Sequence, residues 1–441
     1  MNSIGKSPAF LGLYSQSPKG ITNIARMTTK ATKIPAAPFS RYQMFVIGIL
    51  AFLQFTIVLD FMILSPLGAI LLQELHVGTS QFGLVVSAYA FSAGLSGILA
   101  AGFADRFDRK RLVLFFYTGF ILGTVLCGIA PTYHFLMGAR IITGIFGGVI
   151  SSISFAIIAD LFPMQTRGRV MGYVQTAFAA SQVMGLPIGL FLANHWGWHA
   201  PFLLIASIAT LVGILIALRL KPLTAHLAAA HGRHPVKHLW KTATNRRYLV
   251  GFSATILLAT GGFMLMPFGS AFSVHTLGVP LDKLPMVYMI TGLVSMMAGP
   301  MLGRLSDSIG KYKMFTISTL FCSAIVLWYT GFGLTPLWLV ILANALLFIT
   351  ISGRMVSAMA LTSAIPAPAD RGAYMSVNSS MQQMAGGVAA WVAGLIIVQT
   401  STGKIEHYNR LGWVVVVAML LTLVLMYNVN RMIRRPAVAT A

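Results

Sequence analysis

The chain has 441 residues, of which 57% are hydrophobic and 9% are charged, and Lys and Arg outnumber Asp and Glu by 31 to 9. Soluble domains contain about 25% charged residues, so this composition excludes an ordinary soluble protein and indicates a chain that folds in a lipid bilayer. The formal charge of +22 does not indicate nucleic-acid binding, because the basic residues lie in short clusters between apolar runs rather than on one folded surface.

Residues 1–42 are predicted to form a disordered basic cytoplasmic tail. They contain six Lys and Arg residues and no periodic apolar pattern. The apolar run that begins near Gln43 is too long for the core of a cleavable signal peptide, and no small-residue cleavage site follows it. Met27 is an alternative start, because residues 1–26 add nothing periodic.

Twelve apolar runs of membrane-spanning length follow the tail, if about 20 apolar residues make one crossing. They lie at 43–70, 80–101, 112–130, 134–159, 169–193, 199–219, 248–274, 284–303, 313–332, 336–363, 373–399 and 410–430. We therefore expect an all-α membrane protein with twelve transmembrane helices in two pseudo-symmetric six-helix halves. The expected parts are an N-terminal half at 43–219, a cytoplasmic linker at 220–247, a C-terminal half at 248–430 and a cytoplasmic tail at 431–441.

The basic clusters predict the orientation of these helices. Lys and Arg are dense after every second run, and the intervening loops have only Lys283, Lys404 and Arg410. Loops rich in Lys and Arg are typical of the cytoplasmic side. Both termini are therefore expected in the cytoplasm, and the protein is expected in the plasma membrane, with a bacterial inner membrane favoured.

The two halves repeat each other at an offset near 202 residues. Residues 66–68 (Pro-Leu-Gly) correspond to residues 267–269 (Pro-Phe-Gly), and Asp105 after the second span corresponds to Asp307 after the eighth. Two parallel six-helix repeats are the plan of carriers that rock one half against the other around a site at mid-membrane. The architecture therefore indicates transport.

The loop after the eighth span, from Gly303 to Lys311, reads Gly, three residues, Asp, two residues, Gly and then a base. The loop after the second span keeps the Asp and the basic run but has Ala101 and Asp108 in place of the two glycines. This pattern resembles the loop signature of the major facilitator superfamily. The resemblance extends over about residues 43–430 and implies the two-halved twelve-helix fold.

An Asp beside Arg residues at a helix end can form a charge-assisted latch. In the superfamily this loop is understood as a clasp between the halves, so the resemblance implies gating residues. These are Asp105, Arg106, Arg109, Asp307 and Lys311. The alternative is that the charges set the orientation of the helices alone.

Asp60 is the acid that lies well inside a predicted span. It follows Arg41 by 19 residues, which places it ~28 Å from the cytoplasmic end and ~18 Å from the outer end. A carboxylate at that depth is costly unless it is protonated, paired or hydrated, so it marks a functional site. Its setting resembles the first-span Leu-Asp signature of the twelve-span drug:proton antiporters, which implies proton coupling. The alternative is a structural acid bonded to a neighbouring helix.

Arg140 begins a segment in which Gly144 and Gly148 share its helical face. This segment resembles the superfamily's fourth-span signature, an Arg followed at fourth positions by small residues. Such glycines let helices pack closely while the guanidinium points into the bundle. A long Arg side chain could reach the depth of Asp60, so Arg140 is predicted to tune the proton affinity of Asp60. A snorkelling Arg is the alternative.

The fifth span contains Gly185, Pro187 and Gly189. It is similar to the antiporter signature in which Gly-Pro follows an earlier Gly, but Ser181 replaces that Gly and the Pro is shifted by one place. Antiport is therefore favoured over symport, and helix packing and bending alone are the alternative.

Polar residues in the spans are candidates for a substrate cavity. We expect Tyr89, Gln182, Asn344 and Arg354 among them. Arg354 has no counterpart in the first half, and it is either a substrate or anion contact or a snorkelling cation near the cytoplasmic leaflet.

The sequence therefore predicts a secondary active transporter, in which a proton moving inward through Asp60 drives export of a small amphipathic compound or drug. Proton-coupled uptake of a sugar or organic anion, with Arg140 and Arg354 as anion contacts, is the alternative. A non-transporting membrane sensor that uses the His-bearing linker is an alternative of another class. An enzyme is not expected, because no His-Glu-x-x-His, phosphate loop or nucleophile elbow is present.

The expected partners are protons, a small-molecule substrate and membrane lipid, and the chain is expected to act as a monomer. No cofactor, metal or nucleic acid is expected. The linker histidines have no Cys or acid nearby, which disfavours a metal site. Cys127 and Cys322 lie inside separate apolar runs and are expected to pack rather than to form a disulfide.

Overall fold

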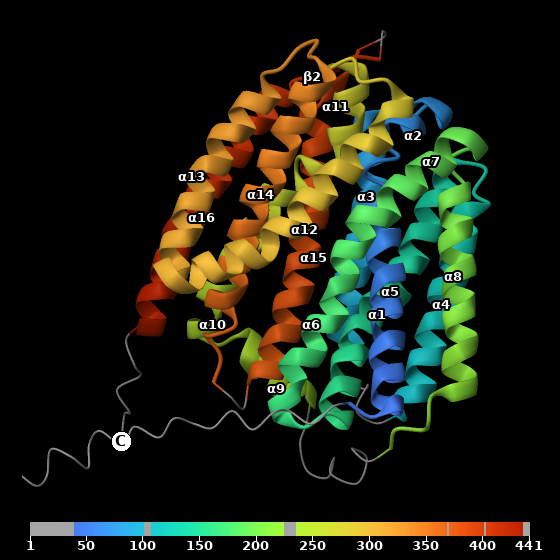
Figure 1. The fold of residues 1–441 in the computed structure, drawn as a ribbon, viewed down its shortest axis with the longest axis vertical. Coiled ribbons are helices and arrows are strands. Elements are labelled where there is room, and N and C mark those ends of the chain that lie inside the picture. The colour runs from blue at the N-terminus through green and yellow to red at the C-terminus, as the bar shows by residue number, and fades with distance from the viewer. Residues whose placement is uncertain (1–38, 101–106, 225–234, 368–369, 401–402, 435–441) are drawn as a thin grey trace, which may run out of the picture. The chain divides into compact units, whose positions relative to one another are not determined.

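The computed structural model describes residues 39–100, 107–224, 235–367, 370–400 and 403–434. From Arg41 onward these residues are almost entirely helical, and Figure 1 shows the helices running side by side. The first half contains α1 (Arg41–Ile63), α2 (Gly68–Glu74), α3 (Thr79–Ala100), α4 (Arg109–Gly128), α5 (Tyr133–Leu161), α6 (Met164–Ala180), a π-helical turn (Ser181–Gly185), α7 (Leu186–Trp196) and α8 (Ala200–Arg219).

The later part of the chain begins with a short linker helix and ends on a long helix. It contains α9 (Pro235–Ala243), α10 (Arg246–Phe263), a 3₁₀ turn (Met266–Phe268), α11 (Gly269–His275), a second 3₁₀ turn (Leu281–Lys283), α12 (Leu284–Ile309), α13 (Lys311–Thr330), α14 (Leu337–Thr362), α15 (Arg371–Ile396), a two-stranded antiparallel hairpin of β1 (Val398–Gln399) and β2 (Ile405–Glu406), and α16 (Tyr408–Arg434).

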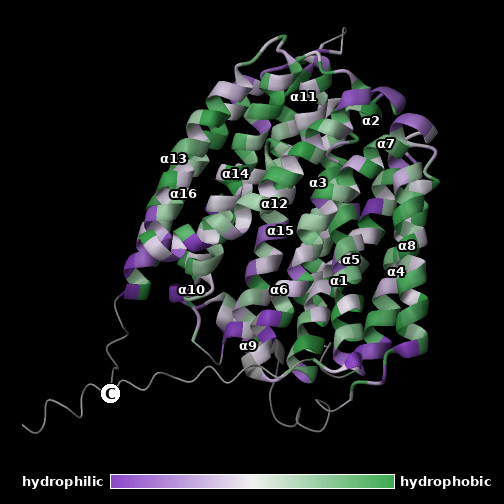
Figure 2. Cartoon of the chain, viewed as in Figure 1, coloured by the Kyte–Doolittle hydropathy of each residue, from purple (hydrophilic) through white to green (hydrophobic). Residues whose placement is uncertain are grey.

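Among the described residues, eleven helical spans are long and apolar enough to cross a membrane. The middle of the bundle is predominantly hydrophobic, as Figure 2 shows. The prediction of an all-α membrane fold is thus confirmed. The remaining predicted span, the eleventh at 373–399, is the helix α15, which is less apolar because it carries Asn378, Gln382 and Gln383. It packs along α3, so it is part of the bundle.

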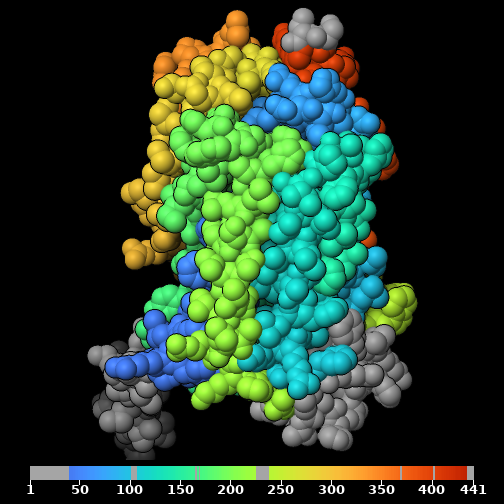
Figure 3. Space-filling view, turned by 90° about the vertical axis from the view of Figure 1, so that its right-hand side faces the viewer, coloured from blue at the N-terminus to red at the C-terminus, as the bar shows by residue number. Residues whose placement is uncertain are grey.

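The two ends of the bundle differ in charge. We call one the basic end, because helices begin or end there at Arg41, Arg109, Arg219, Arg246 and Lys311. The opposite, far end carries α2, α11 and the hairpin (Figure 1). Figure 3 shows the face covered by α4 and α8, with α2 and α7 packed at the far end.

The first and seventh predicted spans, 43–70 and 248–274, are each interrupted near the far end. The first breaks after Ile63 and resumes at Gly68, and the seventh breaks after Phe263 and resumes at Gly269. A proline lies in each break, and proline cannot donate a backbone hydrogen bond and clashes with the preceding helical turn. The breaks fall at repeat-related positions, which fits the two-fold repeat in the sequence.

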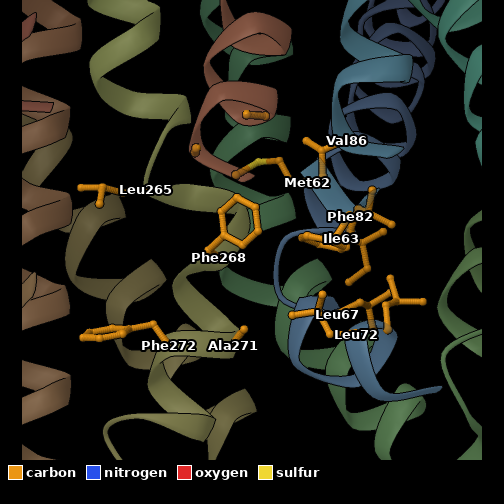
Figure 4. Packing of buried hydrophobic residues seen from close by; sticks show 14 of the residues in the cluster. Met62, Ile63, Leu67, Leu72, Phe82, Val86, Leu265, Phe268, Ala271 and Phe272 are labelled. Carbon is orange, nitrogen blue, oxygen red and sulfur yellow. The ribbon is translucent and has the colours of Figure 1, made fainter. Parts of the chain in front are cut away.

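The two breaks contact each other and join the halves at the far end. The Ser270 hydroxyl donates to the Ser65 carbonyl at 2.7 Å, and the Ser65 hydroxyl donates to the Met266 carbonyl. Apolar side chains surround these bonds, and the rings of Phe82 and Phe268 meet edge to face with centroids 5.7 Å apart. Figure 4 shows Phe268 pointing from the second half toward Phe82 in the first. We call these contacts between the halves the seal at the far end.

Glycines set the closest helix contacts in the first half, and α5 offers a matched pair for testing this. A Cβ added at Gly148 would lie 2.6 Å from the Ala93 Cα in α3, whereas a Cβ added at Gly138 on the same helix would meet no atom within 4 Å. We expect Gly148→Ala to destabilise the protein by about 1–3 kcal/mol, because the α3 backbone must move.

Thermal unfolding of the purified protein in detergent measures this effect. Gly148→Ala should lower the Tm, and Gly138→Ala should leave it unchanged or raise it slightly, since Ala favours a helix over Gly. Equal Tm values for the two variants would contradict the assignment of Gly148 to a close helix contact.

Candidate functional site

Asp60 of α1 and Arg140 of α5 form an ion pair buried inside the first half. The Arg140 Nη1 donates to the Asp60 Oδ2 at 2.8 Å and to the Asp60 carbonyl oxygen at 3.1 Å. The two side chains are 0% and 1% exposed. The structure thus brings together the two residues that the sequence singled out at mid-membrane depth.

Two further side chains complete the surroundings of the pair. The Thr124 hydroxyl of α4 donates to the second oxygen of Asp60, Oδ1, at 3.3 Å. The Arg140 guanidinium carbon lies 4.5 Å from the centre of the Tyr89 ring, at a distance suited to a cation–π interaction. The Arg140 Nε is buried without a hydrogen-bond partner. The guanidinium therefore keeps a donor that another arrangement of the helices could use.

The helix-packing residues predicted from the sequence lie at the contacts that hold this pair. A Cβ added at Gly144, one turn after Arg140, would lie 2.5 Å from the Tyr89 carbonyl oxygen, so α5 and α3 meet backbone to backbone. A Cβ at Gly185 would lie 2.6 Å from Leu59, and Gly189 contacts Ile63 in the same way. Because these residues flank Asp60, the glycines of the fifth span fix the position of α1.

The fifth span is irregular at the segment that resembles the antiporter signature. The π-helical turn Ser181–Gly185 precedes Pro187 of α7, which cannot donate a helical backbone hydrogen bond. The Ser181 hydroxyl donates to the Phe55 carbonyl of α1 at 3.1 Å. Ser181, the residue in place of the signature glycine, thus adds a polar contact to the helix that carries Asp60.

Two residues of the predicted latch, Asp105 and Arg106, lie outside the described residues, and their role in gating stays a prediction. Within the described residues, Arg109 forms an ion pair with Asp160 at the end of α5, with Nε and Oδ2 3.2 Å apart. Sequence reasoning missed Asp160, although it is one of only nine acidic residues in the chain and stands close to the end of an apolar run.

Asp108 was also missed as a structural residue. It caps α4 by accepting from the Lys110 backbone N–H at 3.0 Å, and it accepts from the Leu223 N–H at 2.8 Å. Asp108 therefore ties the start of the linker to the loop at the basic end, which explains an acid where the loop signature has glycine.

Asp307 and Lys311 form an ion pair with each other, four residues apart at the junction of α12 and α13. Both side chains are exposed, and the pair lies within the second half. A role in gating stays a prediction for these two residues.

The four predicted cavity residues come from three elements, α3, the π-helical turn and α14, and their part in a substrate cavity stays a prediction. Tyr89 is 1% exposed and faces Arg140. The backbone of Gln182 packs on Gly292 of α12. The Asn344 amide donates to the Val340 carbonyl of its own helix at 2.9 Å. Arg354 is buried and follows Asn344 by ten residues on α14.

An aromatic contact between the halves lies beside the ion pair. Phe61, which follows Asp60, has its ring centroid 5.3 Å from that of Tyr89 and 5.8 Å from that of Phe263 in α10. Phe61 and Phe263 are half-buried. Sequence reasoning did not single out these two residues, because phenylalanines are numerous throughout the spans.

A family model described as Major Facilitator Superfamily matches residues 50–354 and 252–437. The chain belongs to this superfamily. It is 25% identical over 390 residues to an uncharacterized MFS-type transporter, YceJ, of Bacillus subtilis (strain 168), and the match covers 88% of this chain and 97% of that protein. Multidrug resistance protein 2 of the same organism is 23% identical over 384 residues, 82% of this chain and 90% of its own.

A solved structure with a similar fold is that of a bacterial homologue of the human lysosomal transporter Spinster, in an inward-facing and unoccupied conformation. Its TM-score is 0.73 at 16% identity, and the match covers 91% of this chain and 100% of that one. The protein described here is accordingly an integral membrane protein of a family of secondary transporters.

The buried pair makes a stability prediction. We expect Arg140→Met to destabilise the protein by about 3–5 kcal/mol, because the Asp60 carboxylate would lose its partner inside the bundle. The double variant Asp60→Asn/Arg140→Met should recover much of that loss. Thermal unfolding of the four proteins in detergent, read as a double-mutant cycle, measures the coupling.

Lys283→Met is the matched control, because Lys283 pairs with Asp282 at a surface where both side chains are more than half exposed. Its effect should stay within about 0.5 kcal/mol. Strictly additive losses for Asp60→Asn and Arg140→Met would show that the two residues stabilise the fold independently.

Proposed function

We propose that the protein is a proton-coupled exporter, in which a proton moving inward through Asp60 drives a small amphipathic compound outward. The observation that supports this most directly is the ion pair of Asp60 with Arg140, buried in the apolar bundle at a contact of α1 with α5. An intramembrane acid with a matched cation is costly to keep for structure alone.

The geometry supplies a means of loading and unloading the proton. Burial disfavours the charged form of a carboxyl group, and a guanidinium at 2.8 Å favours it. The proton affinity of Asp60 therefore depends on the distance to Arg140. A shift of α1 relative to α5 that separates the two side chains would load the proton, and their return would release it.

The sealed far end supports alternating access. We infer that the basic end faces the cytoplasm, in line with the excess of Lys and Arg there, and that the arrangement described is closed to the outside. Substrate can leave outward only after the contacts of Ser65 with Met266 and Ser270 open. These contacts bury little charge, so opening them costs less than separating a buried ion pair would.

The aromatic contact beside the pair supports an amphipathic substrate. Phe61, Tyr89 and Phe263 offer ring faces next to the charged site and come from both halves. A compound with an apolar body would pack on these rings. The relationship to Multidrug resistance protein 2 supports export as the direction.

Asp60→Asn is expected to abolish transport driven by a pH gradient, because the amide cannot exchange a proton. The measurement is proton flux in proteoliposomes loaded with a pH-sensitive dye and challenged with a panel of amphipathic compounds. Compounds that move protons in the wild type should move none in Asp60→Asn, while downhill exchange of the same compounds persists.

Asp282→Asn serves as the control, since Asp282 is 71% exposed and lies far from the pair in sequence. Wild-type proton flux in Asp60→Asn vesicles would remove Asp60 from the mechanism. Proton flux that runs with the compound in the same direction would replace export by uptake.

Ser270 reports on the seal, because it is 0% exposed. We expect Ser270→Cys to resist an impermeant thiol reagent in resting vesicles and to react when a transported compound and a proton gradient are both present. Leu334→Cys, at a far-end position that is 88% exposed, should react throughout.

The same two variants test the orientation. Leu334→Cys in intact cells should be labelled from outside. Constant reactivity of Ser270→Cys under all conditions would contradict alternating access at this seal, and failure to label Leu334→Cys in intact cells would invert the proposed orientation.

A further inference from the structure

The second half contains a buried cation that lacks a counter-charge among the described residues. Arg354 of α14 is 2% exposed. Its Nε donates to the Thr319 hydroxyl at 3.2 Å, and its guanidinium carbon lies 5.9 Å from the centre of the Phe315 ring. Its Nη2 is buried without a hydrogen-bond partner. The described acidic residues with recorded side-chain contacts have other partners, so none of them neutralises this charge.

The repeat shows what is missing beside Arg354. The breaks in α1 and α10 put Gly68 and Gly269 at equivalent positions, because each begins the helix that follows a break. Asp60 lies eight residues before Gly68, and Gly261 lies eight residues before Gly269. Gly261 is therefore the counterpart of Asp60 in the second half.

The geometry leads from Gly261 to the same guanidinium. A Cβ added at Gly261 would lie 3.9 Å from the Arg354 Nη2 and 3.4 Å from the Met419 side chain, which are ordinary van der Waals distances. A Cβ at the next residue, Gly262, would meet no atom within 4 Å. The position that carries an acid in the first half thus carries no side chain of its own in the second, and it lies beside the unpartnered Nη2 and the Met419 side chain.

The two halves differ accordingly in charge balance. Arg140 is neutralised by Asp60, whereas Arg354 has hydroxyl, thiol and aromatic neighbours that carry no fixed negative charge. A guanidinium inside a membrane protein without an anion is unfavourable. An anion that arrives from outside the protein would regain that free energy on binding.

We propose that Arg354 and the space beside Gly261 form a carboxylate-binding site, so that the exported amphipathic compound carries a carboxylate or another small anionic group. The inference rests on the proposed export and names its substrate class. The anionic group would take the place of the acid that Gly261 lacks. The apolar body would lie on Phe263, two residues further along α10, and on Phe61.

Restoring the acid tests the site without a ligand. Gly261→Asp should raise the Tm of the full-length protein purified in detergent, because its carboxylate can reach the Arg354 Nη2. Gly261→Asn, which has nearly the same size, should not. In the Arg354→Gln background the benefit of Gly261→Asp should disappear. Equal effects of Asp and Asn at 261, or a benefit that does not depend on Arg354, would overturn the proposal.

Ligand binding gives the second test, with 1-naphthoate as the probe and its neutral amide, 1-naphthamide, as the matched control. The carboxylate should raise the Tm of the wild type more than the amide does. Arg354→Gln should weaken its apparent affinity about 10- to 100-fold, as expected for loss of a hydrogen bond to a charged group. Gly261→Asp should weaken it too, because the site is then filled from within.

Two further arms separate the possible outcomes. Acetate, which corresponds to the missing Asp side chain, should compete with 1-naphthoate. Competition by phosphatidylglycerol and not by acetate would assign the site to a lipid headgroup and overturn the substrate proposal. Asp60→Asn should keep its preference for naphthoate over naphthamide. If the proton-flux experiment shows no coupling but the wild type still prefers naphthoate, the proposed export is wrong and the anion site stands. Equal binding of naphthoate and naphthamide overturns the anion site alone.

Discussion

The ion pair between Asp60 and Arg140 is the central constraint on the first half, because leaving either charge unpaired in an apolar bundle is unfavourable. Hydrogen bonding at 2.8 Å requires α1 and α5 to be held at a fixed distance and rotation. The glycines along α5 and α7 meet this requirement, since they let α5 approach α3 and let α7 approach α1 where larger side chains would separate them. The close packing of these helices is thus a condition for the pair.

The breaks in α1 and α10 serve a second purpose. The turns around Pro66 and Pro267 bring the carbonyls of Ser65 and Met266 within reach of hydroxyl groups from the opposite half, in addition to the backbone N–H groups that these carbonyls already accept. The seal at the far end is therefore made of hydrogen bonds between a side chain and the backbone. Such bonds are individually modest, which suits contacts that must break in each transport cycle.

The two halves share the same backbone geometry around their first helix, but they differ in the charged residues placed there. Both halves break their first helix at equivalent positions, and each carries a buried arginine directed at the same level of that helix. The first half supplies the acid itself, and the second has Gly261. A carrier with one filled and one unfilled position can bind a proton in one half and an anion in the other, and this asymmetry would link the two cargoes through the Phe61 and Phe263 rings.

Sequence reasoning reached the features that depend on local pattern and depth. Helical rise gave the depth of Asp60, and the spacing of Gly144 and Gly148 gave the face of Arg140. The reach of the Arg side chain made their contact a hypothesis, and its geometry was not predictable, because it depends on how α1 and α5 pack. The helix breaks were missed although both prolines were noticed, since counting apolar residues does not detect where a helix stops.

Contacts between residues that are far apart in the sequence could not be predicted either. Asp108 bonds to a backbone group 115 positions away, and Asp160 bonds to Arg109 across 51. Gly261 has no functional group that would mark it in the sequence as a site residue. It was identified only by its position beside Arg354. The ion pair of Arg109 with Asp160 was missed for the same reason, because a loop sequence does not show which helix end lies beside it.

Infrared difference spectroscopy of the reconstituted protein tests the central claim most directly, because it observes the protonated carboxyl group itself. Addition of a transported compound should change the carbonyl absorption of one protonated carboxylic acid, and the change should be absent in Asp60→Asn and present in Asp282→Asn. A carboxyl signal that persists in Asp60→Asn, or that does not respond to the compound in the wild type, would contradict the assignment of the transported proton to Asp60.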